Sequence, residues 1–201
     1  MVKKQEVVQI CLQPVNMKKM KLNIKGKTPL LMDRFSDEVM AQILAKQTGV
    51  AKGNKKKVRD TEKETQDSVH VTSEGFVGFP VYGFKKGMME CTSFVGDKMF
   101  SKKLVSGAVK IVNGVDGLIP IEYEKQDVLK HSIKGQTKFT PQFHKWSCEL
   151  ELLYDANNIS SADIATLVNY AGFYCGIGAW RPKGRDGGSG EFGMYEVMTD
   201  E

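Results

Sequence analysis

The stretch that decides the fold reads Lys145-Trp146-Ser147-Cys148-Glu149-Leu150-Glu151-Leu152-Leu153-Tyr154. Apolar and polar side chains alternate along it, which is the period-2 pattern of a strand with one buried face. A turn over residues 155–158 follows, and then a helix that Ser160 or Ser161 caps. The apolar residues of this helix are spaced three, four and seven apart, as in an amphipathic helix. They are Ile164, Leu167, Val168 and Ala171.

A glycine-rich, basic run comes directly after this helix, GIGAWRPKGRDGGSG over residues 176–190. Glycine permits backbone conformations that a Cβ atom blocks, and cations among glycines can hold a phosphate against exposed N–H groups. We therefore predict a nucleic-acid-binding loop here; a solvated hairpin loop without a ligand is the alternative. The predicted binding residues of the loop are Gly176, Gly178, Trp180, Arg181, Lys183 and Arg185.

The N-terminal part of the chain also reads as strand and then helix. Residues 7–12 are β-prone and predict an edge strand, and from Met20 onward apolar residues alternate with lysine, which predicts a half-buried strand. Asp33 or Ser36 begins a predicted helix. Arg34 at its start is a candidate phosphate ligand, with an ordinary salt bridge as the alternative. The apolar residues of this helix share one face: Phe35, Val39, Met40, Ile43 and Leu44.

Residues 48–74 differ from their surroundings because they are rich in both signs of charge and poor in apolar residues. Such a segment buries too little surface to offset the entropy of ordering, so we predict a mobile insertion. Its basic cluster is either a phosphate contact or a solvated charged loop. The candidate binding residues in it are Lys55, Lys56 and Lys57.

The middle of the chain alternates short helices and strands. Pro80 predicts the start of a helix, and residues 97–106 predict another short one. Residues 109–113 and 118–123 predict two strands around a glycine-containing turn, whereas residues 126–140 are polar and give no clear pattern. A last strand is expected over 192–197. We therefore expect residues 1–201 to form a single α+β domain. Two β-α-β-like halves predict a ferredoxin-like antiparallel sheet with helices on one face.

Composition narrows the class of protein. The net charge of +5 fits a polyanionic partner. No apolar run approaches the roughly 20 residues of a membrane span, and no apolar segment of a signal peptide follows the basic N-terminus, so we expect a cytoplasmic protein. The four cysteines lie far apart and the three histidines are scattered. We therefore expect free, buried thiols, and neither a metal site nor a cofactor.

Two motifs near the C-terminus carry a family resemblance: YAGFYCGIGAWRP at residues 170–182 and GEFGMYEV at residues 190–197. They are similar to the C-terminal signature of RAMP-superfamily proteins, in which a helix runs into a Gly-apolar-Gly loop, a basic stretch, a Gly-x-Phe-Gly segment and a terminal strand. The resemblance covers residues 146–197. The loop here is long, contains Trp180 and Pro182, and has Asp186 among its cations, which leaves the ligand open.

The resemblance implies a ferredoxin-like, RNA-recognition-motif-like core with insertions. It implies non-catalytic binding of single-stranded nucleic acid, RNA before single-stranded DNA. It further implies a homo-oligomer along the strand, as in the subunits that line a guide RNA in CRISPR complexes. A stand-alone bacteriophage relative in the cytoplasm of a bacterial host is the expected setting. A phage protein that binds and inhibits a host defence complex is an alternative.

An enzyme is the other alternative, because some RAMP relatives cleave RNA without a metal and use a histidine as general acid or base. The histidines here are His70, His131 and His144. None stands after the first predicted strand, where Asp33 and Arg34 are found instead, so we predict no catalytic residue. Trp180 is interpreted either as a platform for base stacking or as an anchor of the loop.

Overall fold

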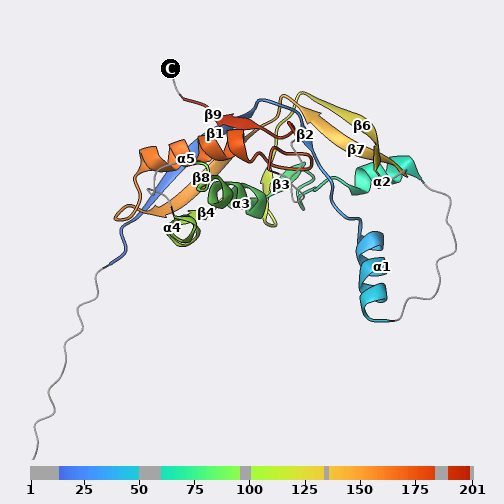
Figure 1. The fold of residues 1–201 in the computed structure, drawn as a ribbon, viewed down its shortest axis with the longest axis horizontal. Helices are drawn as coiled ribbons and strands as arrows, with labels where there is room; N and C mark the ends of the chain where they lie inside the picture. Colours follow the sequence, from blue (N-terminus) through green and yellow to red (C-terminus); the bar gives the residue numbers. More distant parts are fainter. Residues whose placement is uncertain (1–13, 50–59, 96–100, 134–135, 184–189, 200–201) are drawn as a thin grey trace, which may run out of the picture.

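The computed structural model describes residues 14–49, 60–95, 101–133, 136–183 and 190–199. These residues form an α+β structure, as expected; it has three antiparallel sheets and five helices (Figure 1). The predicted edge strand over residues 7–12 lies outside the described residues.

A four-stranded sheet forms the centre of the molecule, and every pair of neighbouring strands in it is antiparallel. Leu22 lies opposite Leu150 in the central pair, and both are buried. Lys19 and Lys21 alternate with the buried residues and point to the other face. The period-2 prediction is confirmed for both central strands. The order of the sheet is β4 (Val109–Ile111), β8 (Ser147–Asp155), β1 (Met17–Gly26) and β9 (Tyr195–Val197).

Helices α3 (Val81–Cys91) and α5 (Ser161–Tyr174) pack on the buried face of this sheet and against each other. Ser160 caps α5 in a capping box with Asp163, which satisfies amide groups at the helix start. The predicted apolar positions of α5 are all buried. Helix α4 (Lys102–Ala108), with Ser101 as its N-cap, leads into β4, and residues 97–100 of the helix predicted over 97–106 lie outside the described residues. The core side chains of the two main helices are Phe84, Met88, Cys91, Ile164, Leu167, Val168 and Ala171.

Two smaller sheets flank the central one. In the first, β6 (Lys125–Ile133) and β7 (Gln136–His144) pair as a hairpin, and β2 (Leu30–Leu31) joins β7. The hairpin lies over residues that gave no clear sequence pattern. In the second, β3 (Gly78–Pro80) pairs with β5 (Leu118–Pro120).

The predicted strands over 109–113 and 118–123 both form, but they separate at the turn between them. β4 pairs with β8 in the central sheet, whereas β5 pairs with β3. The reason is that the turn is closed by reciprocal backbone bonds between Val115 and Leu118 alone, and the chain then diverges into the two sheets.

Helix α1 (Asp37–Gln47) forms where it was predicted, with Ser36 as its N-cap, but it does not join the core. None of its residues is buried, and Figure 1 shows it standing away from the rest of the molecule. The helix that follows β1 in the core is α3 instead.

The insertion predicted over 48–74 lies partly outside the described residues, which omit 50–59. Its second part holds α2 (Thr61–Asp67), which Asp60 caps, and it buries Thr65, Val69 and Thr72. Those few buried side chains attach this part of the insertion to the body.

Cys91, Cys148 and Cys175 are free and buried, as expected, while Cys11 lies outside the described residues. Within the described part of the chain, no helix is long and apolar enough to span a membrane.

Candidate functional site

The glycine-rich loop leaves the end of α5 and is held by backbone hydrogen bonds. The amide of Ala179 donates to Leu31 of β2 (2.9 Å), and that of Ile177 donates to Gly193 (2.9 Å). The amides of Gly176 and Lys183 also donate to carbonyls, those of Ala171 and Cys175. These four amides are therefore engaged within the chain, and a phosphate would have to use other donors.

Gly178 is required at its position for two reasons. Its φ of +82° lies in the left-handed region, and a Cβ atom there would lie 2.4 Å from the carbonyl oxygen of Leu31. Gly176 also has a positive φ, +59°. Gly178 therefore serves close packing of the loop against β2, whereas Gly176 packs against the loop itself, near Pro182 and Gly193.

A cleft of about 390 Å³ lies beside the loop. Its walls come from the loop, from the segment before α1 and from residues 70–86, which run through β3 into α3, so three distant parts of the sequence meet there. Pro80 caps α3 without a side-chain hydrogen bond, and the positive end of the helix dipole borders the cleft. The lining residues are Asp33, His70, Phe79, Pro80, Tyr82, Gly83, Lys86, Ile177, Gly178, Ala179 and Arg181.

Ion pairs set the charge of the cleft wall. The Arg181 guanidinium, whose side chain is 14% exposed, lies 3.5 Å from Glu90, and Lys86 lies 3.8 Å from the same carboxylate. Asp33 pairs with Lys138 at 2.5 Å. The cations Arg181, Lys86 and Lys138 are thus paired with two carboxylates, those of Glu90 and Asp33. These side chains together carry one net positive charge.

His70 adds no charge to the cleft at neutral pH. Burial, and to a smaller degree the guanidinium of Arg34, lowers the pKa of His70 from its usual 6.5. The imidazole is therefore neutral at pH 7, and acts there as a hydrogen-bonding group only.

One exposed aromatic side chain, Tyr82, lines the cleft and is 69% exposed. A second, Trp180, is 46% exposed on the adjoining loop but is not among the lining residues. Trp180 has a φ of +56° and contacts the ring of His131 edge-on. Trp180 thus joins the loop to the β6–β7 hairpin while it leaves part of its indole free.

Other predicted site residues are occupied within the chain. Lys183 lies over the ring of Phe94 at 4.5 Å and approaches the carbonyl oxygen of Glu90. Arg34 forms a salt bridge with Asp37 at 2.7 Å, which is the ordinary alternative considered for it. Arg185 and the cluster of Lys55, Lys56 and Lys57 lie outside the described residues.

The histidines do not form a catalytic arrangement with one another in the described structure. His144 lies 3.2 Å from Asp127 on the hairpin. Both ring nitrogens of His131 are shielded from solvent and have no hydrogen-bond partner among the described residues. Within the same residues, no group of three or more potential ligand side chains is arranged for a metal ion.

Sequence reasoning missed most residues of the cleft, among them Tyr82, Lys86 and His70. Tyr82 and Lys86 lie four positions apart, one helical turn, at the start of a helix that was predicted, but nothing in the pattern places that turn beside the loop. His70 belongs to the insertion. It lies at the cleft because it is in the segment between α2 and β3, both of which pack against the rest of the molecule.

Comparison with protein-family models finds none that matches this chain. Comparison with curated proteins finds no similar sequence either.

Proposed function

We propose that this protein binds single-stranded nucleic acid, RNA before DNA, without cleaving it, and self-associates along the strand. In this proposal it is a cytoplasmic, phage-encoded relative of the RAMP superfamily with a ferredoxin-like core. The strand lies in the cleft beside the glycine-rich loop.

The order of the core elements supports the ferredoxin-like part of the proposal. Along the chain the central sheet and its helices read β1, α3, β4, β8, α5, β9, which is the β-α-β-β-α-β order of that fold. The segments between β1 and α3 and between β4 and β8 are then insertions, and the cleft lies where the first of them meets the loop.

The observation that carries the functional proposal is the exposed ring of Tyr82 in a cleft with net positive charge, with the exposed ring of Trp180 on the adjoining loop. Tyr82 and Trp180 present ring faces on which bases can stack, and Lys86, 42% exposed, can reach a phosphate. Aromatic rings beside cations are the usual means of binding single strands without sequence readout.

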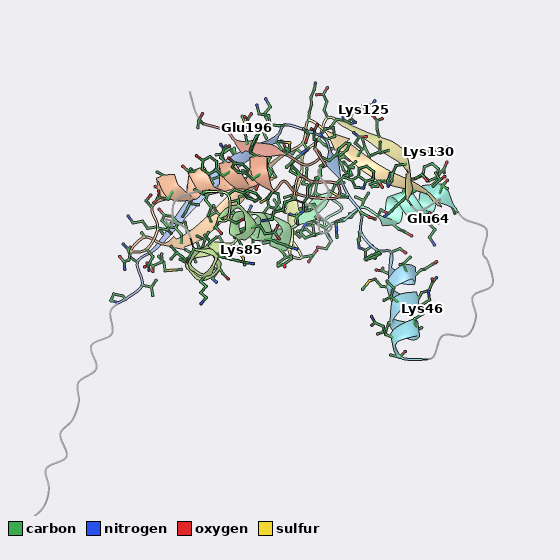
Figure 2. All side chains as sticks on the ribbon, in the orientation of Figure 1. Lys46, Glu64, Lys85, Lys125, Lys130 and Glu196 are labelled. Carbon is green, nitrogen blue, oxygen red and sulfur yellow. The ribbon has the colours of Figure 1, made fainter. Side chains whose placement is uncertain are left out.

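The open face of the central sheet is a poorer platform. Its lysines face glutamates on the next strand, Lys19 with Glu151 at 3.2 Å and Lys21 with Glu149 at 2.9 Å. These pairs neutralise each other, and the described outward positions of β1 and β8 hold no aromatic side chain. Figure 2 shows two further lysines, Lys125 and Lys130, on the β6–β7 hairpin, of which Lys125 pairs with Asp127 at 2.8 Å.

The test is fluorescence anisotropy with labelled single-stranded RNA and DNA at increasing salt. Binding should weaken linearly on logarithmic axes. Tyr82→Ala should weaken it by about 5- to 150-fold, because stacking contributes roughly 1–3 kcal/mol per base. Lys86→Met should reduce the salt slope by about 0.7, the share of one phosphate contact on a single strand.

Phe76→Ala is the matched control, because Phe76 is 57% exposed and does not line the cleft; its affinity should equal that of the wild type. If neither RNA nor DNA binds at low salt, the proposal fails. If both bind but Tyr82→Ala and Phe76→Ala are alike, the cleft is not the site.

A further inference from the structure

Helix α1 presents an apolar face that no described part of the chain covers. We call it the apolar stripe. It consists of Phe35 just before the helix and four aliphatic side chains on it, which are 36–60% exposed. A helix with such a face gains most of its stability by burying it, so an exposed stripe marks a docking surface. The stripe comprises Phe35, Val39, Met40, Ile43 and Leu44.

A second exposed apolar surface lies at the end of α5, and we call it the aromatic surface. The rings of Phe94 and Tyr174 stack with centroids 5.2 Å apart and planes at 4°, and Phe173 and Tyr170 meet Tyr174 edge-on. All four side chains are 37–60% exposed. Lys183 lies on it, 4.5 Å above the Phe94 ring.

The two surfaces match in size. With about 150–250 Å² for a whole aromatic side chain, their exposed fractions give each surface roughly 400 Å² of apolar area. A typical interface buries about 800 Å² on each partner, of which roughly 56–58% is apolar. One stripe against one aromatic surface therefore supplies nearly the apolar part of an ordinary interface.

Charge at the edges also matches. Asp37 and Glu38 occupy the first turn of α1, and their side chains are 90% and 63% exposed. They are paired with Arg34 and Lys63, but at that exposure they remain accessible to the ammonium group of a neighbouring molecule. The aromatic surface carries such a group, Lys183, which also contacts the Glu90 carbonyl and Ser93 within its own chain.

We propose that the apolar stripe of one copy docks on the aromatic surface of a second copy. This deepens the self-association in the proposed function, but the docking needs no nucleic acid. Both surfaces are exposed in the described structure, and α1 stands apart from α5 in Figure 1, so one chain does not bring its own pair together. A contact between two different surfaces leaves one of each free at the ends, and copies add head to tail.

The test uses sedimentation velocity on nuclease-treated protein freed of nucleic acid at high salt. The wild type should form species above the 22.4 kDa monomer whose mass grows with concentration. Leu44→Glu disables the stripe and Phe173→Glu disables the aromatic surface, and each variant alone should be monomeric. Their equimolar mixture should form a dimer and nothing larger, because one intact surface of each kind remains. Val128→Glu, on the exposed side of β6, is the control and should assemble like the wild type.

Each variant should keep the circular-dichroism spectrum and melting temperature of the wild type, since both positions are exposed. A monomeric wild type, assembly of either variant alone, or a mixture that stays monomeric would overturn the inference. Assembly of Phe173→Glu alone would indicate stripe-to-stripe pairing instead. None of these outcomes bears on RNA binding at the cleft, which is measured separately on monomeric Leu44→Glu protein.

Discussion

The indole of Trp180 packs edge-on against the imidazole of His131, with ring centroids 4.9 Å apart and planes at 66°. This contact joins the glycine-rich loop to the β6–β7 hairpin, two segments that belong to different parts of the sheet architecture. Trp180 adopts a left-handed φ of +56°, a backbone conformation that costs free energy in a non-glycine residue. The contact of its indole with His131 helps to hold the residue in this conformation. Anchoring and stacking are thus compatible roles for one side chain.

Trp180 should report directly on nucleic acid. Trp146 is fully buried, so added RNA should quench only the fluorescence of Trp180. Trp180→Phe should abolish this quenching and keep most of the affinity, whereas Trp180→Ala should weaken binding about 5- to 150-fold, the equivalent of one stacked base. Fluorescence titration and anisotropy measure the two effects. Unchanged fluorescence at saturating RNA would assign Trp180 to anchoring alone.

His131 should have no part in cleavage, because its ring nitrogens are shielded from solvent. Labelled RNA should stay intact with the wild type, with His131→Ala and with the control His144→Ala. His131→Ala should instead increase the quenching of Trp180 by iodide, since the ring that packs on the indole is removed. RNA cleavage by the wild type that one of these substitutions abolishes would establish the enzyme in place of the binding protein.

The C-terminal third could be predicted well because its signals are local. The alternation from Cys148 to Tyr154 and the capping of α5 by Ser160 each depend on a few adjacent residues. Helix α1 shows the limit of such signals. Its periodic apolar face specifies a helix, but not which surface covers that face, and here no described residue of the same chain does.

The candidate site could be predicted only in part for a similar reason. The glycines and cations of the loop were visible, but their partners were not. Arg181 is committed to Glu90, and Gly178 to the backbone of Leu31, more than a hundred residues away in sequence. Tyr82 lies at the site because α3 packs beside the loop, and no sequence motif indicates this tertiary contact.

Gly178→Ala should destabilise the protein by about 3 kcal/mol, because the new Cβ atom meets the Leu31 carbonyl in a left-handed conformation. Gly107→Ala is the matched control: Gly107 lies within α4 with open space around it, so alanine should stabilise by about 0.5–1 kcal/mol. Urea denaturation measures both changes. Equal changes in the free energy of unfolding for the two substitutions would contradict the close approach of Gly178 to the Leu31 carbonyl.

Arg181→Met should destabilise by about 1–3 kcal/mol, because it leaves the mostly buried carboxylate of Glu90 without its main partner. Adding Glu90→Gln should recover part of this loss, since no charge then remains to be paired. Lys86→Met removes the more exposed partner of the same carboxylate and should cost less than about 1 kcal/mol. Thermal and urea unfolding of the wild type, the single variants Arg181→Met, Glu90→Gln and Lys86→Met, and the double variant would decide; additive losses in the double variant would argue against coupling.

Stability should depend on alkaline pH through Cys148. Burial raises the pKa of its thiol from 9.0 to about 12. Between those values the unfolded chain releases a proton that the folded chain keeps, so stability falls as pH rises, by up to about 1.4 kcal/mol per pH unit. Cys148→Ala should flatten this slope, as read from unfolding midpoints between pH 8 and pH 11.

Lys85 acts in the opposite direction, because burial lowers the pKa of its ammonium group from 10.5 to about 8. Between pH 8 and pH 10.5 the unfolded chain keeps a proton that the folded chain has lost, so the free energy of unfolding rises with pH there. The difference between the wild type and Cys148→Ala isolates the thiol from this effect. Parallel pH profiles for the two proteins would show that the thiol is not protected from ionisation.

The lysine–glutamate pairs on the open face of the sheet have a consequence for encounters in solution. Together with Lys27 and Glu196, 2.7 Å apart on the same side, they form neighbouring dipoles whose fields cancel within a short distance. The excess of five positive charges therefore resides mainly elsewhere on the chain. The long-range field of the molecule is therefore uneven: a polyanion is drawn toward the parts that carry the excess charge and only weakly toward this paired face.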